Sequence, residues 1–145
     1  MKKKIAFGLL AVLAVIQFIR PTRNDSTGES PNDISKYYEV SADIHAILKK
    51  SCYDCHSNHT EYPWYANIQP VGWWLQNHVN NGKDELNFSE FGTYTEKKAK
   101  HKFDEIEELV HEGEMPLSSY TLIHRDAKLT TEQTEAITSW AGALK

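Results

Sequence analysis

Ser51-Cys52-Tyr53-Asp54-Cys55-His56 is the stretch of this sequence on which the rest of the chain depends. Its spacing, Cys-x-x-Cys-His, is typical of covalent c-type haem attachment. Two thiols three residues apart can reach the two vinyl groups along one edge of a porphyrin, and the next residue is then carried under the iron as an axial ligand. We therefore predict that Cys52 and Cys55 form thioethers to one haem c and that His56 is the proximal iron ligand.

Three other uses of the two cysteines are open. A thioredoxin-like dithiol pair requires Cys-x-x-Cys beside a βαβ pattern, and the sequence shows no such pattern. A zinc site needs four ligands, so two of the seven histidines would have to complete it. A structural disulfide is compatible with an oxidising compartment but leaves His56 without a role. Haem attachment is the interpretation that uses all three residues.

The N-terminus has the pattern of an export segment. Residues 2–4 are all lysine, residues 5–19 are almost entirely apolar, and Arg20 and Pro21 close the run. The apolar run is long for a signal peptide and short for a spanning helix, which needs roughly 17–25 residues. No small-x-small cleavage site follows it. We predict that residues 1–20 form an uncleaved signal-anchor in the bacterial inner membrane, with a cleaved signal peptide and a soluble periplasmic domain as the alternative.

Residues 21–35 are rich in Thr, Asn, Asp, Ser, Gly and Pro, a composition typical of a flexible linker. The haem-binding domain is then expected in residues 36–145, on the periplasmic side of the membrane. The chain has 16 Lys and Arg against 20 Asp and Glu, a formal net charge of −4. This sign argues against nucleic acid as a partner, because phosphate binding requires basic residues. It suits a carrier that meets basic redox partner proteins.

The pattern of apolar residues predicts an all-α fold. Helical spacing recurs in four segments, and no β pattern or internal repeat accompanies them. Asn81-Gly82 is expected to end the second helix and Gly113 the third, while Thr130 and Gln133 form a capping box at the last. The four segments are residues 40–48, 71–79, 95–110 and 130–144.

Aromatic residues follow the motif. Tyr62 and Trp64 lie in a segment without clear periodicity, which we expect to fold as a loop over the haem edge. Together with Trp74, from the next apolar stripe, they are candidates for packing on the porphyrin or for donating to a propionate. Ordinary hydrophobic packing is the alternative for each ring.

Met115 is the predicted sixth ligand of the iron. Apart from Met1 it is the only methionine, so a thioether ligand has one candidate. It lies between Gly113, which should end a helix, and Pro116, which prevents a helix from resuming, and so belongs to a constrained loop. His78, on an otherwise apolar stripe, is the alternative ligand, and a methionine that only fills a gap in the core is the other.

This order of parts resembles a class I c-type cytochrome and, more narrowly, the bacterial haem-binding domain family of small exported proteins. The resemblance covers about residues 40–144. It implies a cytochrome c-like helical domain wrapped around one covalently bound haem, and it implies no particular reaction. The residues that carry it are Cys52–Asn58, Tyr62–Tyr65, Pro70–Trp74 and Met115-Pro116.

The sequence favours a monohaem electron carrier over an enzyme. No acid–base or nucleophilic group of residues has convincing spacing, and electron transfer requires only a rigid, buried haem with one exposed edge. The alternative is a haem-based sensor or a small peroxidase-like enzyme with a labile sixth ligand. His78, His111 or His124 would then be the distal group.

Overall fold

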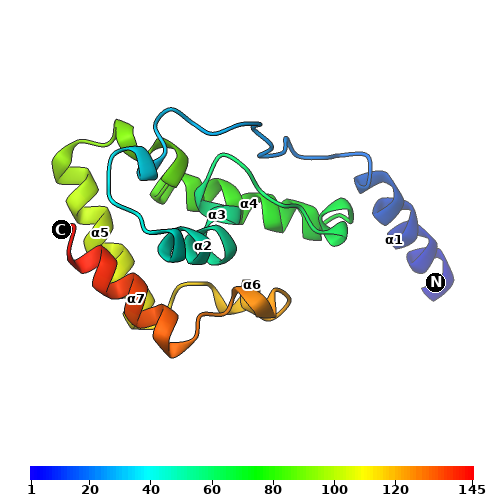
Figure 1. Ribbon diagram of the computed structural model, residues 1–145. Coiled ribbons are helices and arrows are strands. Elements are labelled where there is room, and N and C mark those ends of the chain that lie inside the picture. Colours follow the sequence, from blue (N-terminus) through cyan, green and yellow to red (C-terminus); the bar gives the residue numbers. More distant parts are fainter.

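The computed structural model describes residues 1–145 and consists of helices joined by loops (Figure 1). The predicted all-α class is confirmed, because the only β-type pairing is a single bridge between Asp25 and His59. The α-helices are α1 (Lys2–Ile16), α2 (Ala42–Ser51), α3 (Tyr53–His56), α4 (Val71–Glu85), α5 (Glu96–His111), α6 (Ser118–Thr121) and α7 (Thr131–Gly142). Short 3-10 helices are η1 (Ile34–Lys36), η2 (Trp64–Asn67), η3 (Phe88–Thr93) and η4 (Arg125–Ala127).

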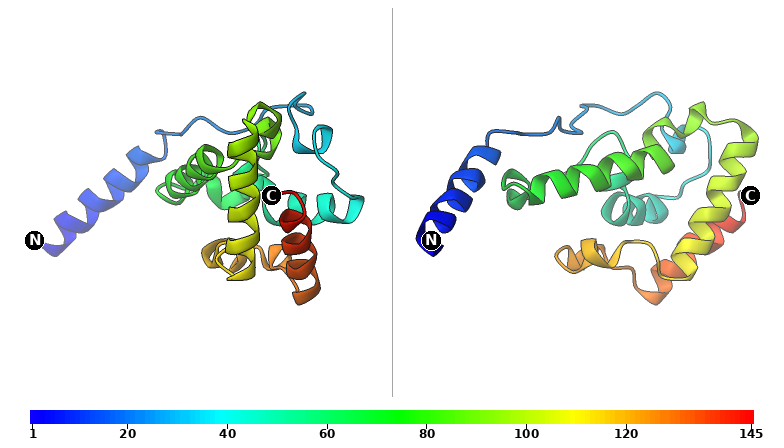
Figure 2. Two further views of the ribbon diagram at one scale, coloured as in Figure 1. Left: turned by 90° about the vertical axis from the view of Figure 1, so that its left-hand side faces the viewer. Right: turned by 180° about the vertical axis from the view of Figure 1, so that it is seen from behind.

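The hydrophobic core lies at the end of the molecule that is remote from α1. There α5 and α7 run side by side, and α4 extends from this end toward α1 (Figures 1 and 2). Phe88, Phe91 and Phe103 are fully buried, and the ring of Trp140 meets that of Phe103 edge-on. Packed aromatic rings bury a large apolar area each, so this cluster contributes to the stability of the fold.

Local chemistry sets the helix ends as the sequence predicts. The Thr130–Gln133 capping box is present at α7. Gly113, at φ 74°, follows the last turn of α5, and its N–H donates to the Val110 carbonyl while that of Glu114 donates to Leu109. These two bonds form a Schellman motif, which satisfies carbonyls that the helix leaves free. The chain therefore leaves α5 in a fixed direction just before Met115.

The predicted helix end at Asn81-Gly82 is wrong, because α4 continues to Glu85. Gly82 lies against α3, and a Cβ added there would lie 2.7 Å from the Cys55 carbonyl oxygen. The glycine thus permits two helices to approach closely. In the interior of a helix, glycine is less stable than alanine, and the close contact with α3 is the reason for its presence here.

Residues 21–35, expected as a flexible linker, are held against the domain. The buried Asn24 side chain donates to the Ser57 carbonyl and to the Thr60 hydroxyl, each at 2.9 Å, and accepts from Lys83 at 2.6 Å. Ile34 is 0% exposed and belongs to the core. The polar side chains in this segment, which suggested a linker, thus include ones that form hydrogen bonds with the domain. The domain boundary at residue 36 stays a prediction.

Helix α1 projects from the opposite end of the molecule and buries none of its residues (Figures 1 and 2). Neither α1 nor any other helix here combines the length and apolar character needed to cross a membrane. The chain after α1 is fixed to the domain. The Gln17 side chain bonds both the N–H and the carbonyl of Gln69, and the Trp73 indole donates to the Ile19 carbonyl at 2.7 Å.

We predict that Ile34→Ala destabilises the protein by about 2–5 kcal/mol, because it removes a fully buried side chain and leaves a cavity. Urea denaturation of the haem-loaded protein, followed by circular dichroism, measures this loss. Ile68→Ala, at a side chain that is 47% exposed, is the matched control and should change the free energy of unfolding by under about 1 kcal/mol. Equal effects of the two substitutions would show that residues 21–35 do not pack on the core.

Candidate functional site

A cavity of about 420 Å³ lies between two walls of the domain, within the size range of small-ligand and cofactor pockets. One wall is formed by α3, α4 and the end of α2, and the other by α5, the α5–α6 loop and α6 (Figure 1). Most of the lining is apolar. Among these residues are Leu48, Leu86, Phe88, Ile106, Leu109 and Val110.

Both cysteines line this cavity as free thiols. Burial raises the pKa of Cys52 to about 12 and that of Cys55 to about 11. The negative charge of a neighbouring group adds to each shift, from Cys55 in the first case and from Asp54 in the second. Both thiols are therefore neutral at neutral pH, whereas the attacking cysteine of a Cys-x-x-Cys redox enzyme has a lowered pKa. This environment differs from that of a dithiol oxidoreductase.

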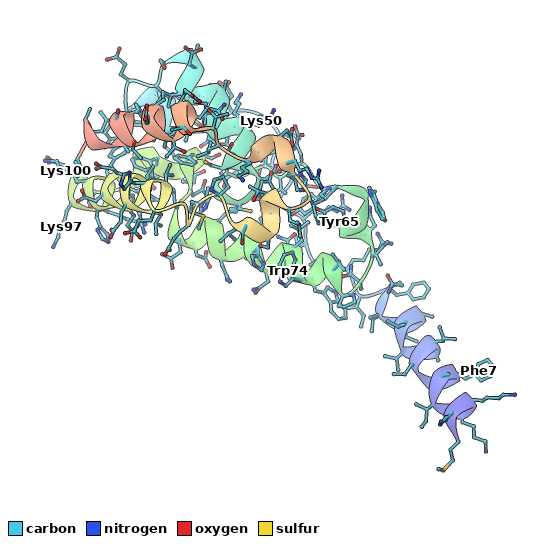
Figure 3. All side chains as sticks on the ribbon, turned by 90° about the horizontal axis from the view of Figure 1, so that it is seen from below. Phe7, Lys50, Tyr65, Trp74, Lys97 and Lys100 are labelled. Atoms are coloured by element: carbon cyan, nitrogen blue, oxygen red, sulfur yellow. The ribbon has the colours of Figure 1, made fainter.

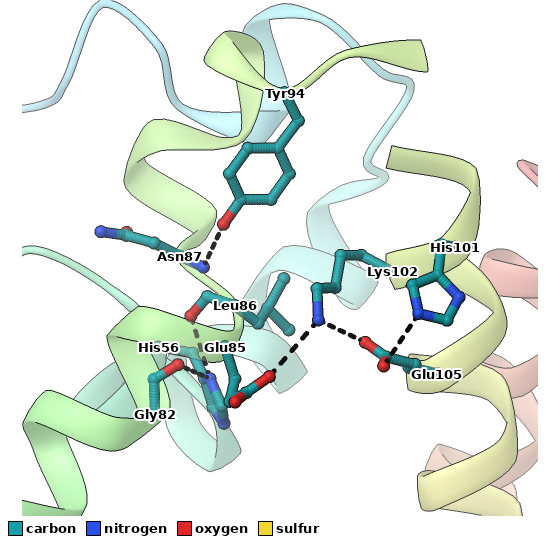
Figure 4. Close-up of polar contacts among 9 residues, drawn as sticks. All are labelled: His56, Gly82, Glu85, Leu86, Asn87, Tyr94, His101, Lys102 and Glu105. Carbon is teal, nitrogen blue, oxygen red and sulfur yellow. Dashed lines mark hydrogen bonds and ion pairs between the residues drawn. The ribbon is translucent and has the colours of Figure 1, made fainter. Parts of the chain in front are cut away.

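His56 is held by two backbone carbonyls at the end of α4. Its Nδ1 lies 2.9 Å from the Gly82 oxygen and 3.0 Å from the Leu86 oxygen (Figure 4). Because both partners only accept, Nδ1 carries the proton and Nε2 carries the free lone pair. Burial lowers the pKa of the imidazole, which keeps it neutral at neutral pH. A neutral imidazole whose other N–H is bonded to a carbonyl is the usual form of a histidine that ligates a metal.

These two carbonyls are available for distinct reasons. The Gly82 oxygen already accepts the Leu86 N–H at 2.9 Å and uses its second lone pair for His56. The Leu86 oxygen lies at the C-cap, where a helix leaves carbonyls without partners. The missing side chain at Gly82 brings α4 close enough to α3 for both bonds to form. The motif histidine is thus positioned by a helix that comes later in the chain.

A buried lysine with two acidic partners, Glu85 and Glu105, lies near His56 (Figure 4). Lys102, whose side chain is only 10% exposed, bonds Glu105 at 2.6 Å and lies 3.6 Å from Glu85. Its positive charge also contributes to the lowered pKa of His56. Lys102, Glu85 and Glu105 all line the cavity. Lys102 follows three other lysines within six residues, and this charged run gives no signal in the sequence that one of them is buried.

The turn that follows α4 is fixed by another contact in the same region. The Asn87 N–H donates to the Tyr94 hydroxyl at 2.9 Å, directly after Leu86 (Figure 4). This bond holds the turn from α4 into η3 and so keeps the Leu86 carbonyl in reach of His56.

Met115 lines the cavity from the wall that does not carry His56. It is half-buried, packs against the core, and its N–H donates to the Leu109 carbonyl at 3.1 Å. His78 also lines the cavity, but from α4, one turn before Gly82 and hence from the same wall as His56. Its Nδ1 donates to the Trp74 carbonyl at 2.9 Å. Met115 stays the predicted sixth ligand, and this arrangement favours it over His78.

Asp54 and Tyr120 connect the two walls. The Tyr120 hydroxyl donates to Asp54 at 2.7 Å, and the other carboxylate oxygen accepts the Glu61 N–H at 3.0 Å. Burial and the bonded carboxylate raise the pKa of Tyr120, which keeps its hydroxyl a donor. Sequence reasoning missed this pair, because nothing in the local pattern shows that residues 66 positions apart will meet.

The three aromatic residues that we expected on the porphyrin do not line the cavity. Tyr62 donates to Gln76 at 2.6 Å, Trp64 is 76% exposed, and Trp74 contacts His78 at the surface with the two rings tilted by 50°. The physical reason is that η2 packs against α4 and not against α3. The predicted contacts of these rings with the haem therefore have no support in the structure.

His111 and His124, the other histidines considered as distal groups, also lie outside the cavity wall. His111 is exposed at the end of α5, and His124 bonds the Tyr65 hydroxyl at 2.7 Å. No group of three or more His, Cys, Asp or Glu side chains gathers to hold a metal ion. Because a zinc site needs four ligands, the zinc interpretation of the two cysteines has no support in the structure.

We predict that Gly82→Ala lowers the fraction of protein that carries haem several-fold, because the new Cβ would push the Cys55 backbone away and break the His56 bonds. The absorbance of haem relative to protein after purification measures this. Gly142→Ala is the matched control, since its Cβ would meet only the end of the flexible Glu107 side chain, at 3.3 Å. Normal haem content in Gly82→Ala would contradict the role assigned to the close approach.

Two comparisons with known proteins found no counterpart: no curated protein and no solved structure matches the chain. A comparison with protein families did find one. The family described as "Haem-binding domain" matches residues 11–143, which include the cysteine motif, both cavity walls and Met115. The chain therefore belongs to the haem-binding domain family.

Proposed function

We propose that this protein binds one haem c covalently and carries electrons outside the cytoplasm. The observation that carries the proposal is that one cavity joins the two motif thiols to the unprotonated Nε2 of His56. Family membership supports haem as the cofactor. The free thiols on the cavity wall support attachment through Cys52 and Cys55.

The donor set fits such a cofactor. Haem would supply an Fe(II)/Fe(III) couple that takes up and releases one electron. Cys52 and Cys55 would hold it by thioethers, and His56 would coordinate through the nitrogen that its carbonyl partners leave unprotonated. The walls of this space are largely apolar, and burial together with axial ligand choice sets the potential of a haem protein.

The position of Met115 supports electron transfer over ligand binding. It enters the cavity from the wall opposite His56, on a segment that the Schellman motif of α5 directs. Methionine and histidine together would close the coordination sphere, as in electron carriers, and would raise the potential. A sensor or peroxidase-like enzyme would instead need an open or labile sixth position, which the Met115 experiment below tests.

The N-terminus supports a location outside the cytoplasm. Three lysines form the first turn of α1 and precede its apolar part, and such a cluster stays on the cytoplasmic side while the following domain is exported. Attachment of haem to this motif takes place on the outer side of the bacterial inner membrane, which agrees with that orientation. The partners would be redox proteins at the same membrane.

We predict that Cys52→Ala and Cys55→Ala each alter the absorption of the alkaline pyridine complex, because one thioether replaces two. The double variant should carry no covalent haem. Haem staining after denaturing electrophoresis measures covalent attachment, and Ser119→Ala, on the exposed face of α6, is the control. A wild-type chain that shows no stained band when made with the maturation machinery would refute the proposal.

We predict that Met115→Ala lowers the reduction potential, opens the iron to carbon monoxide and removes the near-infrared band of a ferric thioether complex. Met115→Leu keeps the volume but not the sulfur, so it should behave in the same way. His78→Ala should leave all three properties unchanged, because His78 belongs to the wall of His56. If only His78→Ala changes the spectrum, Met115 is not the ligand. Prompt binding of carbon monoxide by the wild-type protein would favour a sensor or enzyme.

A further inference from the structure

The exposed apolar side chains of the domain gather at one end. Outside residues 1–19, every exposed large hydrophobic side chain except Tyr37 belongs to this end face. A contiguous apolar surface of this kind marks an interaction site on a protein. We define the end face by its six residues, Trp64, Ile68, Val71, Trp74, Leu122 and Ile123.

Two segments far apart in the sequence build the end face. Residues 64–74 comprise η2 and the start of α4, and residues 122–123 follow α6. The hydrogen bond between Tyr65 and His124 joins the two segments at 2.7 Å. Figure 3 shows Tyr65 and Trp74 at the end of the domain nearest α1, with Lys97 and Lys100 at the opposite end. The end face and the two lysines of α5 therefore lie at opposite ends of the domain.

Helix α1 is fixed beside this end face. The Gln17 side chain makes two hydrogen bonds to Gln69, and the Trp73 indole bonds the Ile19 carbonyl. All these partners lie within or next to residues 68–74. After its three N-terminal lysines, helix α1 is apolar on all sides, and it has no buried residue. A helix of this kind requires apolar surroundings.

Basic residues mark the junction between α1 and the end face. Arg20 and Arg23 both bond the Asn67 side chain, at 3.3 and 2.7 Å, and the Arg23 guanidinium lies 4.8 Å from the centre of the Tyr62 ring. Arginine next to exposed tryptophan is the combination that lipid headgroup regions favour, since the cation meets anionic phosphate and the indole spans polar and apolar layers.

We propose that the end face lies on the lipid–water interface of a membrane while α1 enters the apolar layer. Trp64 and Trp74 then lie at the level of the headgroups, and Arg20 and Arg23 contact lipid phosphates. Because the Trp74 ring contacts His78, which lines the cavity, the cavity is held at a fixed orientation next to the bilayer. This inference rests on the proposed membrane location and is independent of the haem ligands.

The test uses the full haem-loaded chain with vesicles of phosphatidylethanolamine and phosphatidylglycerol. Flotation separates the vesicle-bound protein, and hydroxyl-radical oxidation followed by mass spectrometry measures the exposure of single side chains. Trp64, Leu122 and Ile123 should be oxidised several-fold more slowly with vesicles than without them. Tyr37, the exposed apolar residue outside the end face, should be oxidised at the same rate in both.

Paired variants separate the end face from the anchor. Trp64→Ser with Leu122→Ser should still float through α1 but should lose the protection of Ile68 and Ile123. Lys97→Ser with Lys100→Ser, at the opposite end, is the control for nonspecific charge attraction and should behave as wild type. Neither pair lines the cavity, so the haem absorption of every sample should be unchanged.

Four results would overturn the inference: equal oxidation rates with and without vesicles, protection that includes Tyr37, protection that grows with protein concentration in the absence of lipid, or no flotation. The third would identify the end face as a contact between copies of the chain. The fourth would also refute the membrane location. The haem spectrum of the same samples reports separately on the cofactor, so failure here leaves the haem proposal standing.

Discussion

The hydrogen bonds from Nδ1 of His56 to the carbonyls of Gly82 and Leu86 form the constraint on which the rest of the site depends. It fixes the tautomer and leaves Nε2 unprotonated on a residue that lines the cavity. It also ties the short α3, which could not be stable alone, to the long α4. Only a glycine at position 82 allows this approach. One contact thus sets both the ligand chemistry and the position of a cavity wall.

Features that depend on neighbouring residues could be predicted from the sequence. The motif itself, the capping box at Thr130 and the end of α5 at Gly113 each rest on groups within a few residues of one another. The role of Gly82 could not be predicted in this way. A glycine that ends a helix and one that admits another helix have the same local pattern, and only the contact with Cys55 distinguishes them.

Local composition does not predict whether a residue is buried when its burial depends on contacts with distant parts of the chain. Ile34 follows a polar segment yet enters the core, and Lys102 lies in a charged run yet is buried beside the cavity. The aromatic side chains are the opposite case, and their contact with haem stays a prediction. Their type suggested contact with a cofactor, but Trp64 and Trp74 belong to the outer surface of the domain, where their apolar area needs a different partner. Local patterns were therefore easier to predict than burial and packing, and haem attachment through the motif stays a prediction.

The central claim is that His56 offers Nε2 to iron while Nδ1 keeps its proton between two carbonyls. Nitrogen-15 NMR of the reduced haem-loaded protein tests this most directly, because low-spin ferrous haem with two axial ligands is diamagnetic. The account predicts a slowly exchanging proton on Nδ1 of His56 and no proton on Nε2. A proton found on Nε2, or a His56 ring whose nitrogens exchange freely with water, would contradict it.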